Sequence, residues 1–304
     1  MNAVTLGSDF SLENLSQIDV EIDPRHGIVW VYQKSTPRPC FNPQLIREVR
    51  LVQIMLETYQ GKLPYRGELV PIHYHVLDSR TAGIFSMGGD LHLFYNCIER
   101  KDREGLLKYA TACIDAIHNL ILGFRLPITT ISLVRGDALG GGFEVALSGQ
   151  VVIAERTVDM GFPEILFNTF PGMGGYHLLS QRLHPGQAEK MMLSGKKYKS
   201  EDLHDMGVVD ILAEKSEGKK AVYEYIEKHG KYRNGHLAIQ RVRSKVHPIS
   251  YDDLMEVCEF WVDTVMNVTE RDLKLMQRLA NAQDRRVEAD NRRHFDDKVA
   301  YISQ

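Results

Sequence analysis

Three consecutive glycines, Gly140 to Gly142, constrain the fold of this chain more than any other feature of its sequence. They follow a β-rich run, Ile128 to Val134, and lead directly into the apolar segment Phe143 to Leu147. Glycine lets a backbone approach a ligand where a Cβ would intervene. The apolar segment has helical character, so its first N–H groups are free to face a negative charge. The pattern predicts a strand, a glycine turn and a helix that carries Glu144 in its first turn. A plain strand-to-helix connection is the alternative interpretation.

A second glycine turn of the same kind lies earlier in the chain, at Met87-Gly88-Gly89-Asp90. It follows a short extended segment, Gly83 to Ser86, and precedes two helical patterns, Asp90 to Arg100 and Arg103 to Leu122. The order of strand, glycine turn and helix therefore occurs twice. This repetition favours an α/β fold.

Further strands and helices follow from periodicity. An amphipathic helix is expected to begin at Pro43 with Asn42 as its N-cap, and another helix runs from Tyr176 to Leu183. From Pro185 onward the pattern is mostly helical. Alternating or continuous apolar runs predict strands, of which the first two form a β-hairpin: Ile18 to Ile22, Ile28 to Tyr32, Val70 to Leu77, Val151 to Ala154, Thr157 to Gly161 and, as a weaker signal, Gly207 to Asp210.

These patterns divide the chain into three parts. Residues 1–17 form an irregular N-terminal segment, residues 18–212 a core of strands and helices, and residues 213–304 a helical lobe. The lobe ends in a stretch that is dense in both signs of charge, Asp284 to Lys298, which we expect on a solvated face.

Composition excludes several classes of function. The 304 residues are 43% hydrophobic and 25% charged, as in ordinary globular proteins, and the net charge of -3 predicts no general affinity for nucleic acid or membrane. The four cysteines are far apart, which favours free thiols in a reducing compartment. A basic and apolar N-terminal leader is not apparent, nor is an apolar run of membrane-spanning length. We therefore expect a cytoplasmic protein.

The glycine turns also carry a resemblance to a known family. Together with two later motifs they resemble the crotonase (enoyl-CoA hydratase/isomerase) superfamily over roughly residues 18 to 212. The motifs, in the family's order, are Phe85 to Leu91, Ala138 to Glu144, Met160 to Glu164 with Phe170 to Gly175, and Gly207 to Asp210. The resemblance implies an α/β fold with a crotonase-like ββα spiral core and a C-terminal α-helical lobe.

Within the superfamily the chain resembles the diffusible signal factor synthases, bacterial enzymes that make cis-2-unsaturated fatty acid signals for quorum sensing. Three segments carry this closer resemblance: Arg38 to Phe41, Gly88 to Phe94 and Phe162 to Asn168. It implies dehydration of a medium-chain 3-hydroxyacyl thioester, followed by hydrolysis to the free acid.

The resemblance assigns an oxyanion hole to the glycine turns. Enolisation of a thioester places negative charge on its carbonyl oxygen, and two preorganised backbone N–H groups offset that charge. By matching position the donors are the amides of Met87 and Gly141, with Gly88 as an alternative for the first. Gly140 is assigned to the substrate site beside them.

Two carboxylates occupy the family's positions for proton transfer. Dehydration requires one group to remove the Cα proton and another to protonate the departing hydroxyl. We assign Glu164 as the base and Glu144 as the acid, although the sequence does not decide which pKa is higher. The structural alternatives are a helix-capping charge for Glu144 and a surface carboxylate for Glu164.

Other kinds of catalysis lack a pattern. The same oxyanion hole can serve thioester hydrolysis, with a glutamate activating water. A GxSxG elbow or a Cys/His pair, as covalent catalysis would need, is not found. His73 and His75 alternate along a strand without a third ligand, so we expect neither a metal nor any other cofactor.

For the acyl chain, the residues expected at the substrate site are Met173, Gly174, Trp261 and Leu279, with the helical lobe covering the tail and forming the oligomer. The resemblance suggests a homotrimer or hexamer, and a sensor kinase as regulatory partner. The carrier of the acyl group is either acyl carrier protein or coenzyme A. Lys196, Lys197 and Lys199 form either a docking site for the carrier protein or a solvated face.

Three functions are compatible with the sequence. The first is a crotonase-fold dehydratase with thioesterase activity that releases a cis-2-enoic acid. The second is an enoyl-CoA hydratase of fatty-acid β-oxidation, and the third is a non-catalytic regulatory binding module. The presence of both Glu144 and Glu164 argues against the third as the sole function.

Overall fold

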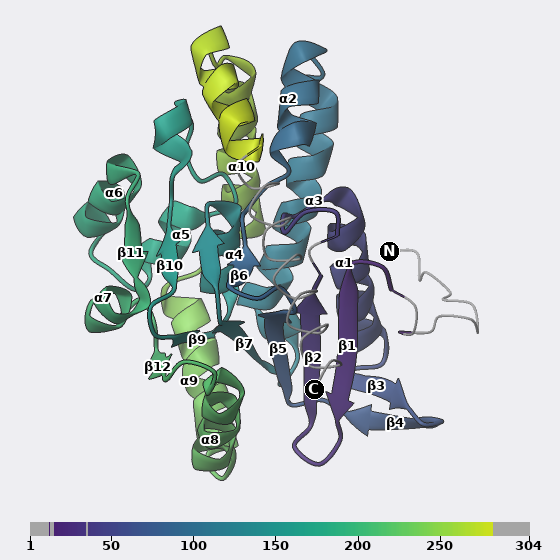
Figure 1. Ribbon diagram of the computed structural model, residues 1–304. Helices are drawn as coiled ribbons and strands as arrows, with labels where there is room; N and C mark the ends of the chain where they lie inside the picture. Colours follow the sequence, from purple (N-terminus) through teal and green to yellow (C-terminus); the bar gives the residue numbers. More distant parts are fainter. Residues whose placement is uncertain (1–11, 13–14, 35, 282–304) are drawn as a thin grey trace, which may run out of the picture.

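A six-stranded sheet forms the centre of the computed structural model, which describes residues 12, 15–34 and 36–281 (Figure 1). The predicted charged tail, Asp284 to Lys298, and most of residues 1–17 lie outside this range. The strand order is β1-β2-β5-β7-β9-β12, in which β1 is antiparallel to β2 and the other neighbours are parallel. The strands are β1 Ile18–Asp23, β2 Ile28–Gln33, β5 Tyr74–Ser79, β7 Thr129–Val134, β9 Val151–Glu155 and β12 Ile211–Ala213.

A second, smaller sheet continues three strands of the first. Its order is β11-β10-β8-β6, and β6, β8 and β10 directly follow β5, β7 and β9 along the chain. Two main-sheet strands thus lead through a short strand into a glycine turn and a helix, as the sequence predicts. The bounds are β6 Ile84–Ser86, β8 Asp137–Leu139, β10 Asp159–Gly161 and β11 Lys197–Lys199.

The helices surround the two sheets. The helices that precede the glycine triplet Gly140 to Gly142 are α1 Pro43–Thr58, α2 Leu91–Glu99, α3 Arg103–Ile121 and the 3-10 helix η1 Gly123–Arg125. After it come α4 Gly141–Ser148, η2 Glu164–Phe167, α5 Gly175–Ser180, α6 Pro185–Ser194, α7 Ser200–Asp205, α8 Gly218–Gly230, α9 Arg233–Val246 and α10 Tyr251–Met266, and residues 270–281 are also helical. None of the described helices is both long and apolar enough to cross a membrane.

Local sequence signals account for most of these boundaries. The hairpin of β1 and β2 is present, and Asn42 caps α1 by accepting a hydrogen bond from the Leu45 amide at 2.9 Å. Asp90 and Asp102 cap α2 and α3 in the same way. The two long helices predicted before the triplet are therefore confirmed, as is the extended segment at β6.

One predicted strand, Val70 to Leu77, is two strands. Its first part is β4 Glu68–Pro71, which forms a separate hairpin with β3 Lys62–Tyr65, and its second part begins β5. The break arises because the amides of His73 and Tyr74 both donate to the Gly27 carbonyl oxygen, at 2.7 and 3.0 Å. That contact ties the chain to the β1–β2 turn and redirects it.

The strand signal at Gly207 to Asp210 is displaced as well. Strand β12 begins only at Ile211, whereas the Asp210 carboxylate accepts a hydrogen bond from the Val152 amide at 2.7 Å. Asp210 therefore fixes β12 beside β9 without belonging to the strand.

Two hydrophobic clusters hold the layers together. The larger one joins α1, α3, α4, α5 and α10, and the smaller one joins the other face of the main sheet to α8. Strand β2 has all six residues buried, because its side chains alternate between these clusters. Helix α10 packs along α3 beside α2, above the end of the sheets that carries the glycine turns (Figure 1).

Candidate active site

The two glycine turns meet at the end of the short strands. Gly88 and Gly140 have positive φ values of 91° and 57°, a backbone conformation that residues with a side chain rarely adopt. A Cβ on Gly88 would lie 2.8 Å from the Leu139 carbonyl oxygen and 3.0 Å from the Gly141 nitrogen. The glycines are required because the backbones themselves are in contact.

The backbone amides at this junction are not equally free. Gly141 opens α4, so its N–H has no acceptor within the helix. The Met87 amide donates to the Pro39 carbonyl oxygen at 2.7 Å, and the Gly88 amide makes a longer contact to Ser86 Oγ at 3.3 Å. The hydrogen bond to Pro39 argues against the predicted role of the Met87 amide.

Gly89 is the amide that the sequence analysis missed. No described residue accepts a hydrogen bond from its N–H, and its nitrogen is 3.4 Å from the position of a Cβ on Gly141. A signal was present in the sequence: Asp90 caps α2, which makes Gly89 the last residue before the cap. The junction therefore offers the Gly89 and Gly141 amides as a pair of donors.

Glu144 is held from one side by backbone donors. Its Oε1 accepts hydrogen bonds from the Met173 amide at 2.7 Å and the Gly175 amide at 2.8 Å. The side chain is only 1% exposed. Burial raises the pKa of Glu144 to about 7, against the opposing effect of the two amides. The carboxyl group is thus able to exchange a proton near neutral pH.

Glu164 has fewer partners. It begins η2 directly after Pro163, is 8% exposed, and has no hydrogen-bond partner for Oε2 among the described residues. Its Oε1 would lie 2.7 Å from a Cβ on Gly140, so the carboxyl group rests against the glycine turn. Burial, and next the charge of Glu144, raise the pKa of Glu164 well above its ordinary value. Both carboxyl groups therefore hold a proton at a pH at which an exposed glutamate has lost it.

One cavity of about 350 Å³ brings these groups together. Gly174 is not among its walls: this residue has a φ of 92°, precedes α5, and a Cβ there would meet Leu254. The other nine predicted site residues line the cavity, namely Met87, Gly88, Gly140, Gly141, Glu144, Glu164, Met173, Trp261 and Leu279.

The rest of the wall is almost entirely apolar. Trp261 packs edge-on against Phe94, with ring centroids 5.1 Å apart, and covers Gly172. With an exposure of 8% it is a buried wall residue. Helices α2, α3, α10 and residues 270–281 supply further apolar side chains: Leu91, Ala110, Val265, Met276 and Leu279. Such a cavity suits a hydrocarbon chain next to two carboxyl groups.

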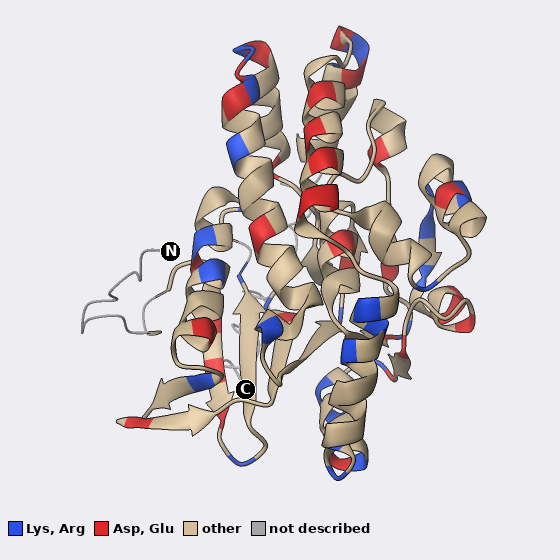
Figure 2. Cartoon of the chain, turned by 180° about the vertical axis from the view of Figure 1, so that it is seen from behind, with Lys and Arg blue, Asp and Glu red and all other residues tan. Residues whose placement is uncertain are grey.

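Few cations lie near the glutamates. Lys197 is the only basic residue among the described residues that line the cavity, whereas Lys199 is paired with Asp159 at 2.7 Å. Away from the cavity the two signs of charge are separated between helices: α10 carries acidic residues and no lysine or arginine, whereas α9 carries lysine and arginine and no acidic residue (Figure 2). The cavity therefore offers little positive charge to lower the raised pKa values of the two glutamates.

The four cysteines lie in the described part of the chain, and all of them are buried. That part contains no group of three or more residues that could hold a metal ion. His75 is 1% exposed, and burial lowers its pKa to about 4. Cys113 borders the cavity, but burial raises the pKa of its thiol, which keeps it protonated.

The chain is similar to known proteins in its sequence and in its fold. The sequence profile described as "Enoyl-CoA hydratase/isomerase" matches residues 72–272. An enoyl-CoA hydratase/isomerase from Xanthobacter autotrophicus Py2 superposes with a TM-score of 0.70 at 17% identity, over 91% of this chain and 97% of that one.

Two further solved structures have the same fold. For an enoyl-CoA hydratase from Bacillus halodurans the TM-score is 0.66 at 18% identity, with 90% of this chain and all of that one covered. For DspI from Pseudomonas aeruginosa it is 0.64 at 21% identity, with 85% and 98% covered. At these identities the likeness shows the fold.

Proposed function

The chain belongs to the enoyl-CoA hydratase/isomerase family, and from this premise we propose that it dehydrates a medium-chain 3-hydroxyacyl thioester and hydrolyses the resulting 2-enoyl thioester. The product is a cis-2-unsaturated fatty acid of the kind used as a quorum-sensing signal. The observation that carries the proposal is the pair Glu144 and Glu164, both buried in one apolar cavity beside two free backbone amides. The pair supplies a base and an acid, and the amides supply an oxyanion hole.

The dehydration begins with the thioester carbonyl oxygen between the Gly89 and Gly141 amides. Charge that develops on this oxygen is stabilised by the two N–H groups in a cavity of low polarity. Glu164 lies against Gly140 and so beside this carbonyl. Its carboxylate removes the Cα proton, the C3–O bond breaks, and Glu144 gives its proton to the departing hydroxyl, which leaves as water.

These roles require a particular placement of the proton within the pair. Burial and the charge of Glu144 raise the pKa of Glu164, whereas a base must begin without its proton. The productive complex therefore carries one proton on the pair, and Glu144 holds it. Because the two groups interact, their apparent pKa values belong to the pair.

Exchange of the substrate's Cα proton with solvent deuterium tests the assignment. We expect Glu144→Gln to retain exchange without elimination, because the base is still present. Glu164→Gln should lose both exchange and elimination. The opposite result would exchange the two roles.

Hydrolysis uses the same site a second time. A glutamate activates water for attack on the enoyl carbonyl, the tetrahedral oxyanion occupies the two amides, and the thiol departs with a proton. This step consumes the water molecule that dehydration released, or an equivalent one. It needs no covalent nucleophile.

We propose acyl carrier protein as the carrier of the acyl group. The support is Lys197, which lines the cavity, next to Lys196, which is not part of any ion pair among the described residues. Two adjacent cations, one of which lines the cavity, suit an acidic protein surface. Coenzyme A is the competing carrier and is part of the test below.

We also propose assembly as a homotrimer or hexamer through the C-terminal helices. Helix α9 has no buried residue, although Ile239, Val242 and Val246 recur on one face and are 60% to 70% exposed. An exposed apolar face of this kind marks an interface. Light scattering of the protein and of Val242→Glu measures the assembly. The proposed sensor-kinase partner stays a prediction.

Mass spectrometry of the products from 3-hydroxydodecanoyl thioesters, on acyl carrier protein and on coenzyme A, tests the function. A free unsaturated acid is the expected product, with faster release from the carrier protein. An equilibrium of hydroxyacyl and enoyl thioesters would instead indicate an ordinary hydratase. The absence of turnover on both carriers would indicate a binding module.

A further inference from the structure

Met173 occupies the junction of the two glycine turns. Its backbone is fixed, because its amide donates to Glu144 Oε1 at 2.7 Å. Its side chain reaches the other turn, where the methyl carbon Cε would lie 2.6 Å from a Cβ on Gly141. The same Cβ position is 3.4 Å from the Gly89 nitrogen. The methyl group therefore fills space beside both candidate oxyanion donors.

A small apolar void also borders Met173. Its volume is about 20 Å³, and it is separate from the catalytic cavity. Among the described residues, only Met173 and Cys113 border both spaces. A space of this size accommodates roughly one group as large as water or methyl, and an apolar void of this kind stays dry. Its other walls include Val49 of α1 and Ala116 of α3.

We propose that the Met173 side chain is a gate that moves between these two spaces. In the closed position its methyl group covers the junction of the glycine turns. When the thioester carbonyl arrives at the Gly89 and Gly141 amides, the side chain rotates and its methyl group enters the void. This inference rests on the proposed function, because the group that displaces Met173 is the thioester carbonyl.

The chemistry of methionine suits this motion. Its side chain is unbranched and has three rotatable bonds, so it changes rotamer readily. Both positions are apolar, so the movement exposes no hydrocarbon to water. The backbone stays in place, and the hydrogen bond from the Met173 amide to Glu144 is kept throughout. Opening the oxyanion hole therefore leaves the position of Glu144 unchanged.

Filling the void tests the gate. Ala116→Val adds two methyl groups to one wall, and Val49→Ile adds one as a milder second variant. Ala112→Val is the matched control, since Ala112 is on the same helix and lines neither space. The ligand is dodecanoyl carba(dethia)pantetheine, in which a methylene replaces the thioester sulfur and which cannot be dehydrated or hydrolysed.

We expect Ala116→Val to raise the Kd of this ligand at least tenfold and Val49→Ile to raise it less, with no change for Ala112→Val. Met173→Ala should remove the effect of Ala116→Val, because a methyl side chain needs no space to move into. If Ala116→Val weakens binding equally with and without Met173→Ala, or if neither void-filling variant weakens it, the gate is overturned.

Methionine methyl NMR follows the side chain directly. The signal that disappears in Met173→Ala identifies the residue, and we expect this signal to shift when the ligand binds. A ligand that binds without moving the signal would overturn the gate and leave the proposed function standing. A wild-type protein that does not bind the ligand at all would contradict the proposed function.

Discussion

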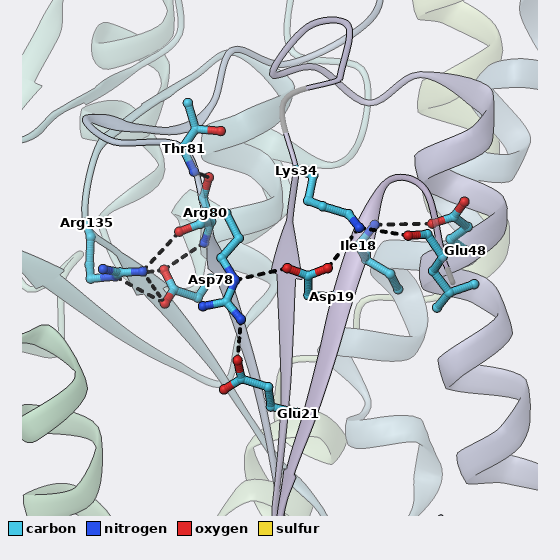
Figure 3. Close-up of polar contacts among 11 residues, drawn as sticks. Ile18, Asp19, Glu21, Lys34, Glu48, Asp78, Arg80, Thr81 and Arg135 are labelled. Carbon is cyan, nitrogen blue, oxygen red and sulfur yellow. Dashed lines mark hydrogen bonds and ion pairs between the residues drawn. The ribbon is translucent and has the colours of Figure 1, made fainter. Parts of the chain in front are cut away.

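Glu48 and the pair Glu144 and Glu164 are all buried glutamates, yet they differ in how fully their carboxyl oxygens are hydrogen-bonded. Glu48, on α1, is 5% exposed and accepts hydrogen bonds from the amides of Ser16, Gln17 and Ile18 at 3.0, 2.8 and 3.2 Å. Figure 3 shows it facing the start of β1. Burial alone would raise its pKa, but hydrogen bonds from Gln44, Ser16 and Gln17 lower it.

Asp78, in the same region, is also fully satisfied. It is 0% exposed and paired with Arg135, whose guanidinium donates to both carboxylate oxygens at 2.9 and 2.7 Å (Figure 3). Glu144 has two amide donors on one oxygen, whereas Oε2 of Glu164 has no hydrogen-bond partner among the described residues. Burial alone therefore does not decide the pKa of a glutamate in this fold: donors to both oxygens lower the pKa of Glu48, whereas the pKa values of Glu144 and Glu164, with fewer donors, are raised.

Removing either catalytic carboxyl group should have the largest effect. Glu144→Gln and Glu164→Gln each eliminate one partner in proton transfer, so we expect turnover of a 3-hydroxyacyl thioester to fall about 10³-fold or more. Steady-state kinetics measures this. Glu48→Gln is the matched control, and it should keep the turnover of the folded protein. Near-wild-type turnover in either catalytic variant would refute the assignment.

The next largest effect concerns the oxyanion hole. Gly141→Val places a β-branched side chain against Met173 and Gly89, and it should reduce turnover by roughly 10² to 10³-fold with both glutamates intact. Binding should weaken as well. Gly235→Ala is the control, because a Cβ added at Gly235 would meet no atom within 4 Å. Unchanged kinetics in Gly141→Val would show that the turn only connects a strand to a helix and has no part in catalysis.

Stability against pH should separate the two kinds of glutamate. A carboxyl group with a raised pKa loses its contribution to stability as pH rises from its unfolded to its folded value. For Glu144 that window runs from 4.5 to about 7. Glu144→Gln avoids this loss and should increase the free energy of unfolding by about 3 kcal/mol at pH 8, with little gain near pH 4.

Glu48→Gln should behave in the opposite way. The lowered pKa of Glu48 contributes stability above its unfolded value, and this contribution disappears as pH falls through the folded pKa. The variant should therefore be less stable than wild type at pH 7 and approach it in acid. Urea unfolding at several pH values measures both trends. If the stability of the two variants changed with pH in the same direction, the proposed difference between Glu48 and Glu144 would be wrong.

The smallest expected effect is on chain length. If the tail lies against Trp261, Trp261→Ala should change the preference between twelve- and eight-carbon 3-hydroxyacyl thioesters by several-fold, because each buried methylene contributes about 0.8 kcal/mol. Short substrates should lose least. Competition between the two substrates gives the ratio of kcat/KM values. If the ratio of kcat/KM values is unchanged in a stable Trp261→Ala variant, the acyl tail does not lie against Trp261.

The sequence predicted those parts of the site that depend on local pattern. Each glycine turn follows its own short strand and leads into its own helix, so the positions of Gly141 and Glu144 could be inferred from their neighbours in the chain. The sequence predicts the Met87 amide as an oxyanion donor, whereas in the structure this amide donates to the carbonyl oxygen of Pro39. Pro39 lies in a loop about fifty residues earlier in the chain. Local periodicity does not show such a contact.

Two further differences have similar causes. The strand predicted at Val70 to Leu77 is interrupted by the carbonyl of Gly27, a contact made only in the folded sheet. Gly174 belongs to the same glycine-rich loop as Met173, but the loop directs it toward Leu254 and away from the cavity. The raised pKa values of Glu144 and Glu164 also depend on burial, which local periodicity does not show.

The most direct test of the central claim is the titration of individual glutamate side chains by NMR of ¹³C-labelled carboxyl groups. Signals are assigned by their loss in Glu48→Gln, Glu144→Gln and Glu164→Gln. We predict that Glu48 titrates below 4.5, that Glu144 titrates near 7, and that Glu164 also titrates well above 4.5. If Glu144 and Glu164 both ionise near 4.5, they are ordinary carboxylates, and the account of a proton-sharing catalytic pair is wrong.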